Sequence, residues 1–389
     1  MKITKVVATP INVPMEAPYV WSVGMLTGMP KTVVQVFTDE GLIGIGEGPS
    51  DAQANIINDV IGPYLIGKDP LQITDLEAGV IPEWRSAMNI CDPNMARAWG
   101  AIDIALWDLR GKYWEQPLYQ LLGGAYRKDI KFTEYFTYRL GKEQSVEEVV
   151  DYCVRMKEEH GSMWFEGKAG FSDAENELKL YRRLRESLGD AAELRIDANY
   201  GWSLPTARKM VRELESLNIR NIEDPVIGLQ NMARLRQHTS IPFSTHEMDL
   251  PQSVASGAPD AFVGNIATLG GVAATVRFAA ACEAMGRNFW FYSGDGGIMT
   301  AAYMHITAAM PGMTEPHQLL SRWQTMDVIE EGVFKATNNI IQVPEGHGLG
   351  VTLNDELLKA AHQHYLDNGP CDEFKRLDDN QPYNRCPRF

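Results

Sequence analysis

Hydrophobic and polar positions change their spacing near residue 130. Beyond it, short apolar runs of strand length alternate with stretches in which apolar residues recur at three- and four-residue steps, the mark of amphipathic helices. Strands that alternate with helices eight times favour a parallel (β/α)8 barrel over an open sheet, and no GxGxxG sequence follows the first strand, which disfavours a dinucleotide-binding fold. The predicted strands lie near 130–135, 162–168, 194–198, 221–224, 241–246, 261–265, 288–293 and 313–317, and the helices near 145–160, 173–188, 205–217, 229–238, 251–257, 270–285 and 298–309.

The chain before residue 130 has a different pattern. Residues 31–38 and 42–47 alternate on either side of Gly41, which predicts a β-hairpin, and residues 94–112 have the spacing of a helix buried on one face. Residues 15–30 are rich in Gly, Pro, Met and aromatic side chains, so we expect an irregular loop there. This loop either covers the surface or acts as a lid over a pocket, with Tyr19 and Trp21 as candidate substrate contacts.

These patterns divide the chain into three parts and define an α/β fold class. We expect a smaller α+β unit at 1–125 that includes the loop at 15–30, a (β/α)8 TIM barrel at 126–335, and a C-terminal segment at 336–389 that returns to the first unit.

Composition narrows the possible partners and compartment. The formal net charge of −15 argues against nucleic acid or an anionic membrane as a partner, and no apolar run is long enough to span a bilayer. The chain start alternates like an edge strand and lacks the apolar stretch of a signal peptide. The five cysteines are dispersed without CxxC spacing, which suggests free thiols in a reducing cytoplasm.

Acidic residues end three consecutive predicted strands. Asp197, Glu223 and Glu247 are each separated by about one strand–helix unit, so a barrel would place their carboxylates side by side at its mouth. Three unpaired carboxylates would repel one another, whereas a hard divalent cation with oxygen ligands would neutralise them, and Mg²⁺ fits this description. For any single acid, pairing with a nearby Arg or Lys is the simpler interpretation. For three in register, we favour a metal site.

Other polar residues at strand ends are candidates for catalysis and substrate binding. Glu166 and Lys168 lie on one face of the strand before the acids, and a cation beside Lys168 would favour its neutral form, making it a candidate general base. Asn199 could bind substrate or a metal-bound water. His246 adjoins Glu247, although strand alternation directs it away from the mouth. Ser293 and Asp295 follow the seventh strand as weaker candidates for substrate contact.

Family motifs occur along nearly the whole chain, at residues 101–112, 117–124, 195–199, 222–225 and 270–271. With these motifs the chain resembles the mandelate racemase and muconate-lactonizing branch of the enolase superfamily. The resemblance implies an α+β capping domain at 1–125 on a modified (β/α)8 barrel, Mg²⁺ on Asp197, Glu223 and Glu247, abstraction of a proton α to a carboxylate, and a homo-oligomer. Within this branch, residues 288–294 and 315–323 look most similar to glucarate-dehydratase-like proteins.

Several positions depart from the pattern of this family. Where the family usually has Lys-x-Lys, this chain has Glu166-Gly-Lys168. The base candidate Lys168 therefore has an acid beside it in place of a second lysine, which would favour the charged form of Lys168. The acid expected after the sixth strand is Asn265, and the His expected after the seventh is Tyr292. The missing His–Asp base argues against two-base racemisation.

A further departure concerns Arg322, which stands where relatives often have a Glu, with Glu315 as a rival for that position. We expect Glu166 and Arg322 to form an ion pair across the mouth, with Arg322 available to bind a carboxylate. An exposed surface Arg is the alternative.

The leading hypothesis is a Mg²⁺-dependent lyase that dehydrates a hydroxy acid, with an acid sugar as the expected substrate. Lys168 would take the α-proton and Tyr292 would protonate the leaving hydroxyl. The first alternative is a single-base isomerase or cycloisomerase on the same scaffold. The second is a metal-binding barrel that has lost catalysis and binds a ligand or partner.

Overall fold

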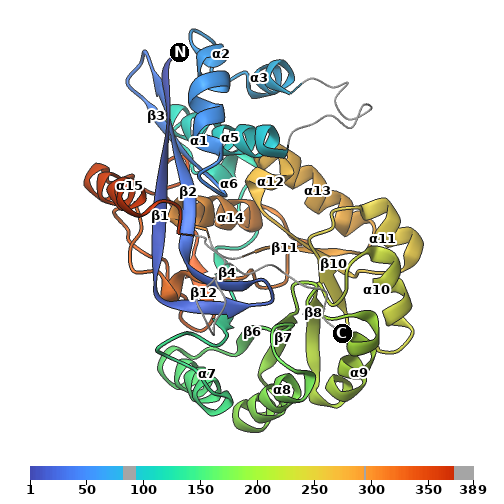
Figure 1. Cartoon of the computed structure of the whole chain (residues 1–389). Coiled ribbons are helices and arrows are strands. Elements are labelled where there is room, and N and C mark those ends of the chain that lie inside the picture. Colours follow the sequence, from blue (N-terminus) through green and yellow to red (C-terminus); the bar gives the residue numbers. More distant parts are fainter. Residues whose placement is uncertain (82–92, 293–294, 372–389) are drawn as a thin grey trace.

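The computed structural model describes residues 1–81, 93–292 and 295–371, which form an antiparallel capping sheet with helices and a curled parallel sheet (Figure 1). This arrangement confirms the predicted α/β fold class. None of the described helices is long and apolar enough to cross a bilayer. Cys153, Cys282 and Cys371 are free thiols.

The capping sheet consists of β1 (Ile3–Trp21), β2 (Gly24–Thr38) and β3 (Ile43–Gly48) in that order. The prediction of an irregular loop at 15–30 is wrong, because β1 and β2 continue through this segment and pair as far as Trp21 and Gly24. The barrel supports the end of this hairpin, since the backbone N–H of Val20 donates to the carbonyl of Tyr138 at 2.9 Å. Tertiary contacts thus impose strand structure on a segment whose composition predicted a loop.

The helices of the capping region pack on one side of its sheet. Gly44 and Gly46 let β3 approach α5 closely, because an added Cβ at either position would lie 2.1 Å from a carbonyl oxygen of that helix. The helices are α1 (Gln53–Ile56), α2 (Gly62–Leu65), α3 (Ile73–Val80), α5 (Pro93–Tyr113) and α6 (Leu118–Leu121), with a π-helical turn at Ile57–Ile61.

Seven neighbouring parallel strands form the curled sheet in the described part of the chain. Each strand is short and almost wholly buried, as expected for a barrel covered by helices. In chain order they are β5 (Glu134–Phe136), β6 (Trp164–Lys168), β7 (Glu193–Asp197), β8 (Ile219–Glu223), β9 (Phe243–Thr245), β10 (Ala261–Gly264) and β11 (Asn288–Phe291).

Helices follow the strands and surround the sheet (Figure 1). Side chains cap the starts of several of them, as at Ser145, whose hydroxyl and Glu148 form a capping box. The helices are α7 (Val146–His160), α8 (Ala174–Leu188), α9 (Leu204–Leu214), α10 (Leu229–Arg236), α11 (Leu250–Ser256), α12 (Ile266–Leu269), α13 (Val272–Ala284) and α14 (Gly297–Ala309), with short 3₁₀ turns at Glu215–Leu217 and Ser321–Trp323.

The prediction of an eighth strand at 313–317 is wrong, because this segment forms only an isolated parallel bridge between Phe132 and His317. It nevertheless closes the sheet: the backbone N–H of Gln318 donates to the carbonyl of Phe291 at 3.0 Å, and that of Thr133 donates to His317 at 2.7 Å. Pro316 has no N–H to donate, which prevents a continuous ladder here.

The strand expected near 130–135 divides into two. β4 (Asp129–Lys131) pairs with β12 (Ile340–Gln342) in a separate antiparallel ribbon, and β5 joins the barrel. The last described helix, α15 (Asp355–Asn368), packs on β1, where the ring of His362 lies 2.7 Å from the carbonyl oxygen of Pro10.

The contact between β3 and α5 predicts a specific destabilisation. We expect Gly46→Ala to lower the free energy of unfolding by about 1–3 kcal/mol, because strand and helix must move apart. Gly48→Ala is the matched control on the same strand, since its nearest neighbours lie at an ordinary 3.4 Å. Urea denaturation of both variants measures the difference, and equal stability would contradict the close contact.

The closure of the barrel makes stability depend on His317. Its Nδ1 accepts from the backbone N–H of Phe291 at 3.1 Å, and its Nε2 lies 2.7 Å from the Thr307 hydroxyl. Burial, with the charges of Arg195 and Arg127, lowers the pKa of His317 from 6.5 to about 3. Below pH 6.5 the unfolded chain therefore binds a proton that the folded chain does not, and stability falls as the pH falls.

We expect this loss of stability to approach 1.4 kcal/mol per pH unit, or about 2 kcal/mol between pH 6.5 and pH 5. Urea unfolding at pH 7.5 and pH 5 should show a smaller pH effect in His317→Gln than in wild type. His347→Gln, at an exposed position, is the control. An unchanged pH effect in His317→Gln would refute this role.

Candidate active site

Three ionisable side chains lie side by side at the carboxyl ends of adjacent strands. Strand register places Lys168 opposite Asp197 and Asp197 opposite Glu223. The ammonium of Lys168 lies 2.5 Å from Asp197 Oδ2, and the Tyr135 hydroxyl donates to the same oxygen at 3.1 Å. The base candidate and two predicted metal ligands thus occupy one layer at the mouth of the barrel.

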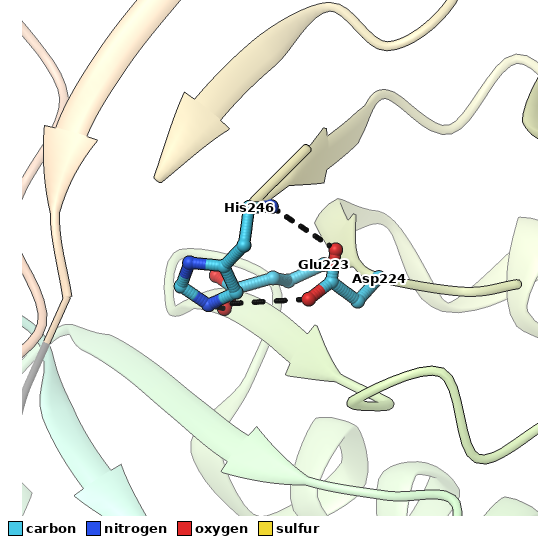
Figure 2. A group of neighbouring side chains, drawn as sticks. All are labelled: Glu223, Asp224 and His246. Carbon is cyan, nitrogen blue, oxygen red and sulfur yellow. Dashed lines mark hydrogen bonds and ion pairs between the residues drawn. The ribbon is translucent and has the colours of Figure 1, made fainter. Parts of the chain in front are cut away.

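Glu223, Asp224 and His246 form the one group of potential metal-ligating atoms among the described residues, within 4.8 Å of one another. Figure 2 shows the His246 ring facing both carboxylates, with Nε2 3.1 Å from Glu223 Oε1 and 3.9 Å from Asp224 Oδ2. The expectation that His246 points away is wrong, because β9 ends at Thr245 and strand alternation stops there. Asp224 follows β8 with φ of +44°, which ends the alternation of that strand too.

The electrostatics of this cluster suit a divalent cation. Burial and the charge of Asp197 raise the pKa of Glu223 to about 8, and burial raises that of Asp224 to about 6. Burial lowers the pKa of His246, but Asp224 and Glu223 outweigh it and raise that pKa to about 10. Glu223 Oε1 and Asp224 Oδ2 are buried, and both face the His246 ring. Carboxylate oxygens are the ligands that Mg²⁺ prefers, whereas an imidazole nitrogen suits softer metals.

Glu247 lies outside this cluster. Its Oε1 accepts from the backbone N–H of Gly228 at 2.8 Å, at the start of α10. The structure therefore brings Asp197 and Glu223 together, while Glu247 remains on the loop after β9.

Glu166 lies one layer below the mouth and is fully buried. The expected ion pair between Glu166 and Arg322 is wrong, because Glu166 Oε2 lies 3.5 Å from Nη1 of Arg195, its register neighbour on β7. Arg322 instead lies beside Glu134, with Nε 2.9 Å from Oε1, and also donates to the carbonyl of Ala336. Strand register decided the pairing, since Arg195 is adjacent to Glu166 and buried with it.

Arg195 belongs to a larger buried network. Its guanidinium donates to Glu315 at 2.9 Å and to the carbonyl of Pro316 at 2.8 Å, and it lies 4.2 Å from the Trp290 ring centroid. Glu315, a rival of Arg322 in the sequence, thus neutralises Arg195 away from the mouth.

The ends of β10 and β11 hold a second polar cluster. Asn265 Nδ2 donates to Asp295 Oδ2 at 2.9 Å and to the Tyr303 hydroxyl at 2.7 Å, and its Oδ1 caps α12. Asp295 also pairs with Lys31 of β2, at 2.8 Å with both side chains buried. Asn265 is therefore occupied by protein groups on three sides. Ser293 lies outside the described residues.

The aromatic candidates lie around the mouth. The ring of Tyr292 lies 5.5 Å from that of His246, and burial raises the pKa of Tyr292 well above its usual value. The ammonium of Lys168 lies 5.5 Å from the ring centroid of Trp21, at the end of the hairpin. Tyr19 is buried against Trp323, with ring centroids 5.9 Å apart.

The hairpin end and Asn199 are joined by a hydrogen bond. The hydroxyl of Ser22 donates to the carbonyl of Asn199 at 2.9 Å, and the backbone N–H of Asn199 donates to Asp197 Oδ1 at 3.0 Å. The hairpin therefore contacts the loop that follows the candidate metal ligand Asp197.

Sequence reasoning missed Asp224, Lys31 and Gln318. Gln318 Nε2 donates to Glu166 Oε1 at 2.7 Å and to Glu223 Oε2 at 2.6 Å. A signal existed for Asp224, which directly follows Glu223, and for Lys31, a cation at the start of an apolar strand. Gln318 had none, because its role depends on where an irregular segment crosses the barrel.

Two family models cover most of the chain. "Enolase C-terminal domain-like" matches residues 148–357, and "Mandelate racemase / muconate lactonizing enzyme, N-terminal domain" matches residues 3–123. Both matches agree with the resemblance that the sequence motifs carried.

Curated relatives of different activity match almost the full length. A chloromuconate cycloisomerase of Cupriavidus necator is 28% identical over 92% of this chain and 98% of its own. A cis-3-hydroxy-L-proline dehydratase of Roseibium aggregatum is 30% identical over 90% of this chain and 96% of its own. An N-succinyl-L-Arg/Lys racemase of Bacillus cereus is 27% identical over 92% and 97%.

Solved structures share the whole fold. An enolase from Pseudomonas fluorescens with bound magnesium, potassium and tartrate has a TM-score of 0.87 and 26% identity, covering 95% of this chain and 94% of its own. An enolase from Thermobispora bispora complexed with magnesium and formate has a TM-score of 0.87 and 25% identity, covering 96% and 95%. These magnesium-bound relatives, with the acidic cluster, confirm the predicted Mg²⁺ cofactor.

Glu223 provides the first test of the cluster. We expect Glu223→Gln to weaken Mg²⁺ binding at least about tenfold, because it removes a negative oxygen ligand. The metal-free variant should be no less stable than wild type, since burial disfavours the ionised carboxylate that it replaces. Isothermal titration with Mg²⁺ and thermal unfolding measure the two effects.

The matched control is Glu193→Gln, at the opposite end of β7. Its Mg²⁺ affinity should equal that of wild type, because this end of a barrel serves stability rather than ligand binding. Wild-type affinity in Glu223→Gln would exclude Glu223 as a ligand.

Proposed function

This chain belongs to the mandelate racemase and muconate lactonizing enzyme branch of the enolase superfamily, and it is a Mg²⁺-dependent enzyme that acts on a carboxylate. From this we propose that it dehydrates a hydroxy acid. An acid sugar is the proposed substrate class, and relatives that bind tartrate are consistent with it. The observation that carries this proposal is the shared layer of Lys168, Asp197 and Glu223 at one end of three adjacent strands.

Lys168 is the proposed general base. Its ammonium now pairs with Asp197. A cation bound to Asp197 would remove this counter-charge and favour the neutral amine, which is the form that accepts a proton. Trp21 and Tyr135, with ring centroids 5.5 Å and 5.4 Å from Nζ, restrict access of water to the amine. The α-proton of the substrate is transferred to this nitrogen.

We propose Asp197, Glu223 and Glu247 as the Mg²⁺ ligands. Glu247 is partly exposed, and its carboxylate would leave the backbone N–H of Gly228 to bind the metal. His246 is the nearer group but a poorer ligand for Mg²⁺, because its donor is nitrogen. Bound there, Mg²⁺ would hold the substrate carboxylate and stabilise the negative charge that develops on it.

The far side of the mouth supports chemistry with a single base. Asn265 and Asp295 are engaged with each other, with Tyr303 and with Lys31. Tyr292 is the proposed acid: it keeps its proton at neutral pH because burial raises its pKa. The bond between the β-carbon and its hydroxyl breaks, Tyr292 gives a proton to the leaving group, and water is released.

The other candidate residues have supporting roles in this proposal. Trp21 and Asn199 would contact the substrate from above, with the hairpin as a cover over the site. Tyr19, Glu166 and Arg322 would support the site from within the protein rather than bind substrate.

A single-base cycloisomerase is the second candidate. It is supported by the 28% identity to chloromuconate cycloisomerases over almost the whole chain. The two reactions differ in mass balance, since a dehydratase releases water and a cycloisomerase does not.

We further propose a cytoplasmic homo-oligomer divided into domains at 1–125, 126–335 and 336–389. The free thiols of the described cysteines are compatible with a reducing compartment.

Activity in D₂O with Mg²⁺ tests the proposal. A panel of acid sugars and dicarboxylates, including tartrate, should contain a substrate that loses one water and exchanges its α-proton. Lys168→Met should abolish both events, with a loss of at least about 10²-fold. Tyr292→Phe should slow water loss by about 10²-fold while leaving exchange nearly intact, because the base remains. Mass spectrometry and proton NMR give the two readouts.

Lys179→Met is the control, since this exposed lysine pairs only with Glu147 among the described residues. A product with the same mass as its substrate would show that the enzyme is an isomerase and not a dehydratase. Full activity in Lys168→Met would refute Lys168 as the base.

A further inference from the structure

Gln318 connects two carboxylates at different depths of the barrel. Its Nε2 donates one hydrogen bond to Glu166, below the mouth, at 2.7 Å and another to Glu223, at the mouth, at 2.6 Å. Gln318 and both acids are almost completely buried. An amide nitrogen carries two protons, so one group serves both acceptors.

The orientation of this amide follows from its surroundings. When both carboxylates are ionised, the amide oxygen in the same place would meet two acceptors and no donor, so the amide nitrogen faces them. The backbone on which Gln318 sits is also fixed, because its N–H donates to Phe291 where the barrel closes.

The two carboxylate oxygens of Glu223 have different partners. Oε2 accepts from Gln318, whereas Oε1 faces His246 Nε2 at 3.1 Å. The amide therefore holds the carboxylate in the rotamer that presents Oε1 to the acidic cluster.

The other end of the bridge is firmly anchored. Glu166 accepts from Thr133 at 3.3 Å and pairs with Arg195, which is itself held by Glu315. The glutamate at position 166 thus serves as the fixed acceptor for Gln318 and does not face the substrate.

We propose that Gln318, anchored by Glu166, is a positioning residue that orients Glu223 for the metal. This inference rests on the proposed role of Glu223 as a Mg²⁺ ligand. Groups that hydrogen-bond metal ligands commonly change metal affinity 10- to 100-fold when they are replaced.

The test is Mg²⁺ titration of the full-length protein by calorimetry. Gln318→Met keeps the length of the side chain but removes both donors, and the dissociation constant should rise about tenfold. Gln324→Met is the matched control, because Gln324 is a similarly buried glutamine that donates to the carbonyl of Asp295 at 3.0 Å rather than to a carboxylate. Its dissociation constant should stay within about twofold of wild type.

Two further variants sharpen the result. Glu166→Gln retains an oxygen acceptor for Gln318, so its Mg²⁺ affinity should stay within about threefold of wild type. Gln318→Asn keeps the amide but is one methylene shorter and cannot reach both carboxylates. It should weaken Mg²⁺ binding as Gln318→Met does, and it carries the test if Gln318→Met does not fold.

The outcomes separate this inference from the proposed function. Weaker binding in Glu223→Gln together with wild-type affinity in both Gln318 variants would overturn the positioning role and leave the metal site standing. Wild-type affinity in Glu223→Gln would overturn the metal role of Glu223 itself. An equal loss in Gln324→Met would also overturn the inference, because the effect would then not be specific to the bridge.

Discussion

The need to neutralise buried charge at the mouth of the barrel governs this site. Parallel register places Lys168, Asp197 and Glu223 on neighbouring strands, and burial raises the pKa of Glu223. Lysine and histidine side chains compensate part of the negative charge. A divalent cation would neutralise the rest, which is why the arrangement suits a metal-dependent reaction.

Glu166, at a position where the family resemblance implies a lysine, is buried with its charge paired. Arg195 is its register neighbour on β7 and forms an ion pair with it. Gln318 and Thr133 donate hydrogen bonds to its carboxylate. The acid is thereby part of the interior of the barrel. Removal of Arg195 would leave a buried, uncompensated carboxylate, which is among the most costly defects in a protein core.

The capping region contributes directly to the architecture of the site. Its hairpin brings Trp21 over Lys168, and Lys31 forms a buried ion pair with Asp295 after β11. Glu47 of β3 accepts from the backbone N–H groups of Gly296 and Met299 at the start of α14. Strands of the capping sheet thus hold Asp295 and the start of α14 in place, so the two sheets form the site together.

The sequence by itself determined the barrel, the strand ends that carry charge, and the Mg²⁺ requirement, because strand and helix periodicity are local properties and the family motifs are contiguous. Only the tertiary structure decided that residues 15–30 are strands, that 313–317 closes the barrel without one, and that Glu166 pairs with Arg195 rather than Arg322. Those outcomes depend on which atoms come within about 3.5 Å of one another across the barrel. Alternation along a strand predicts the direction of its side chains only up to the residue where that strand ends.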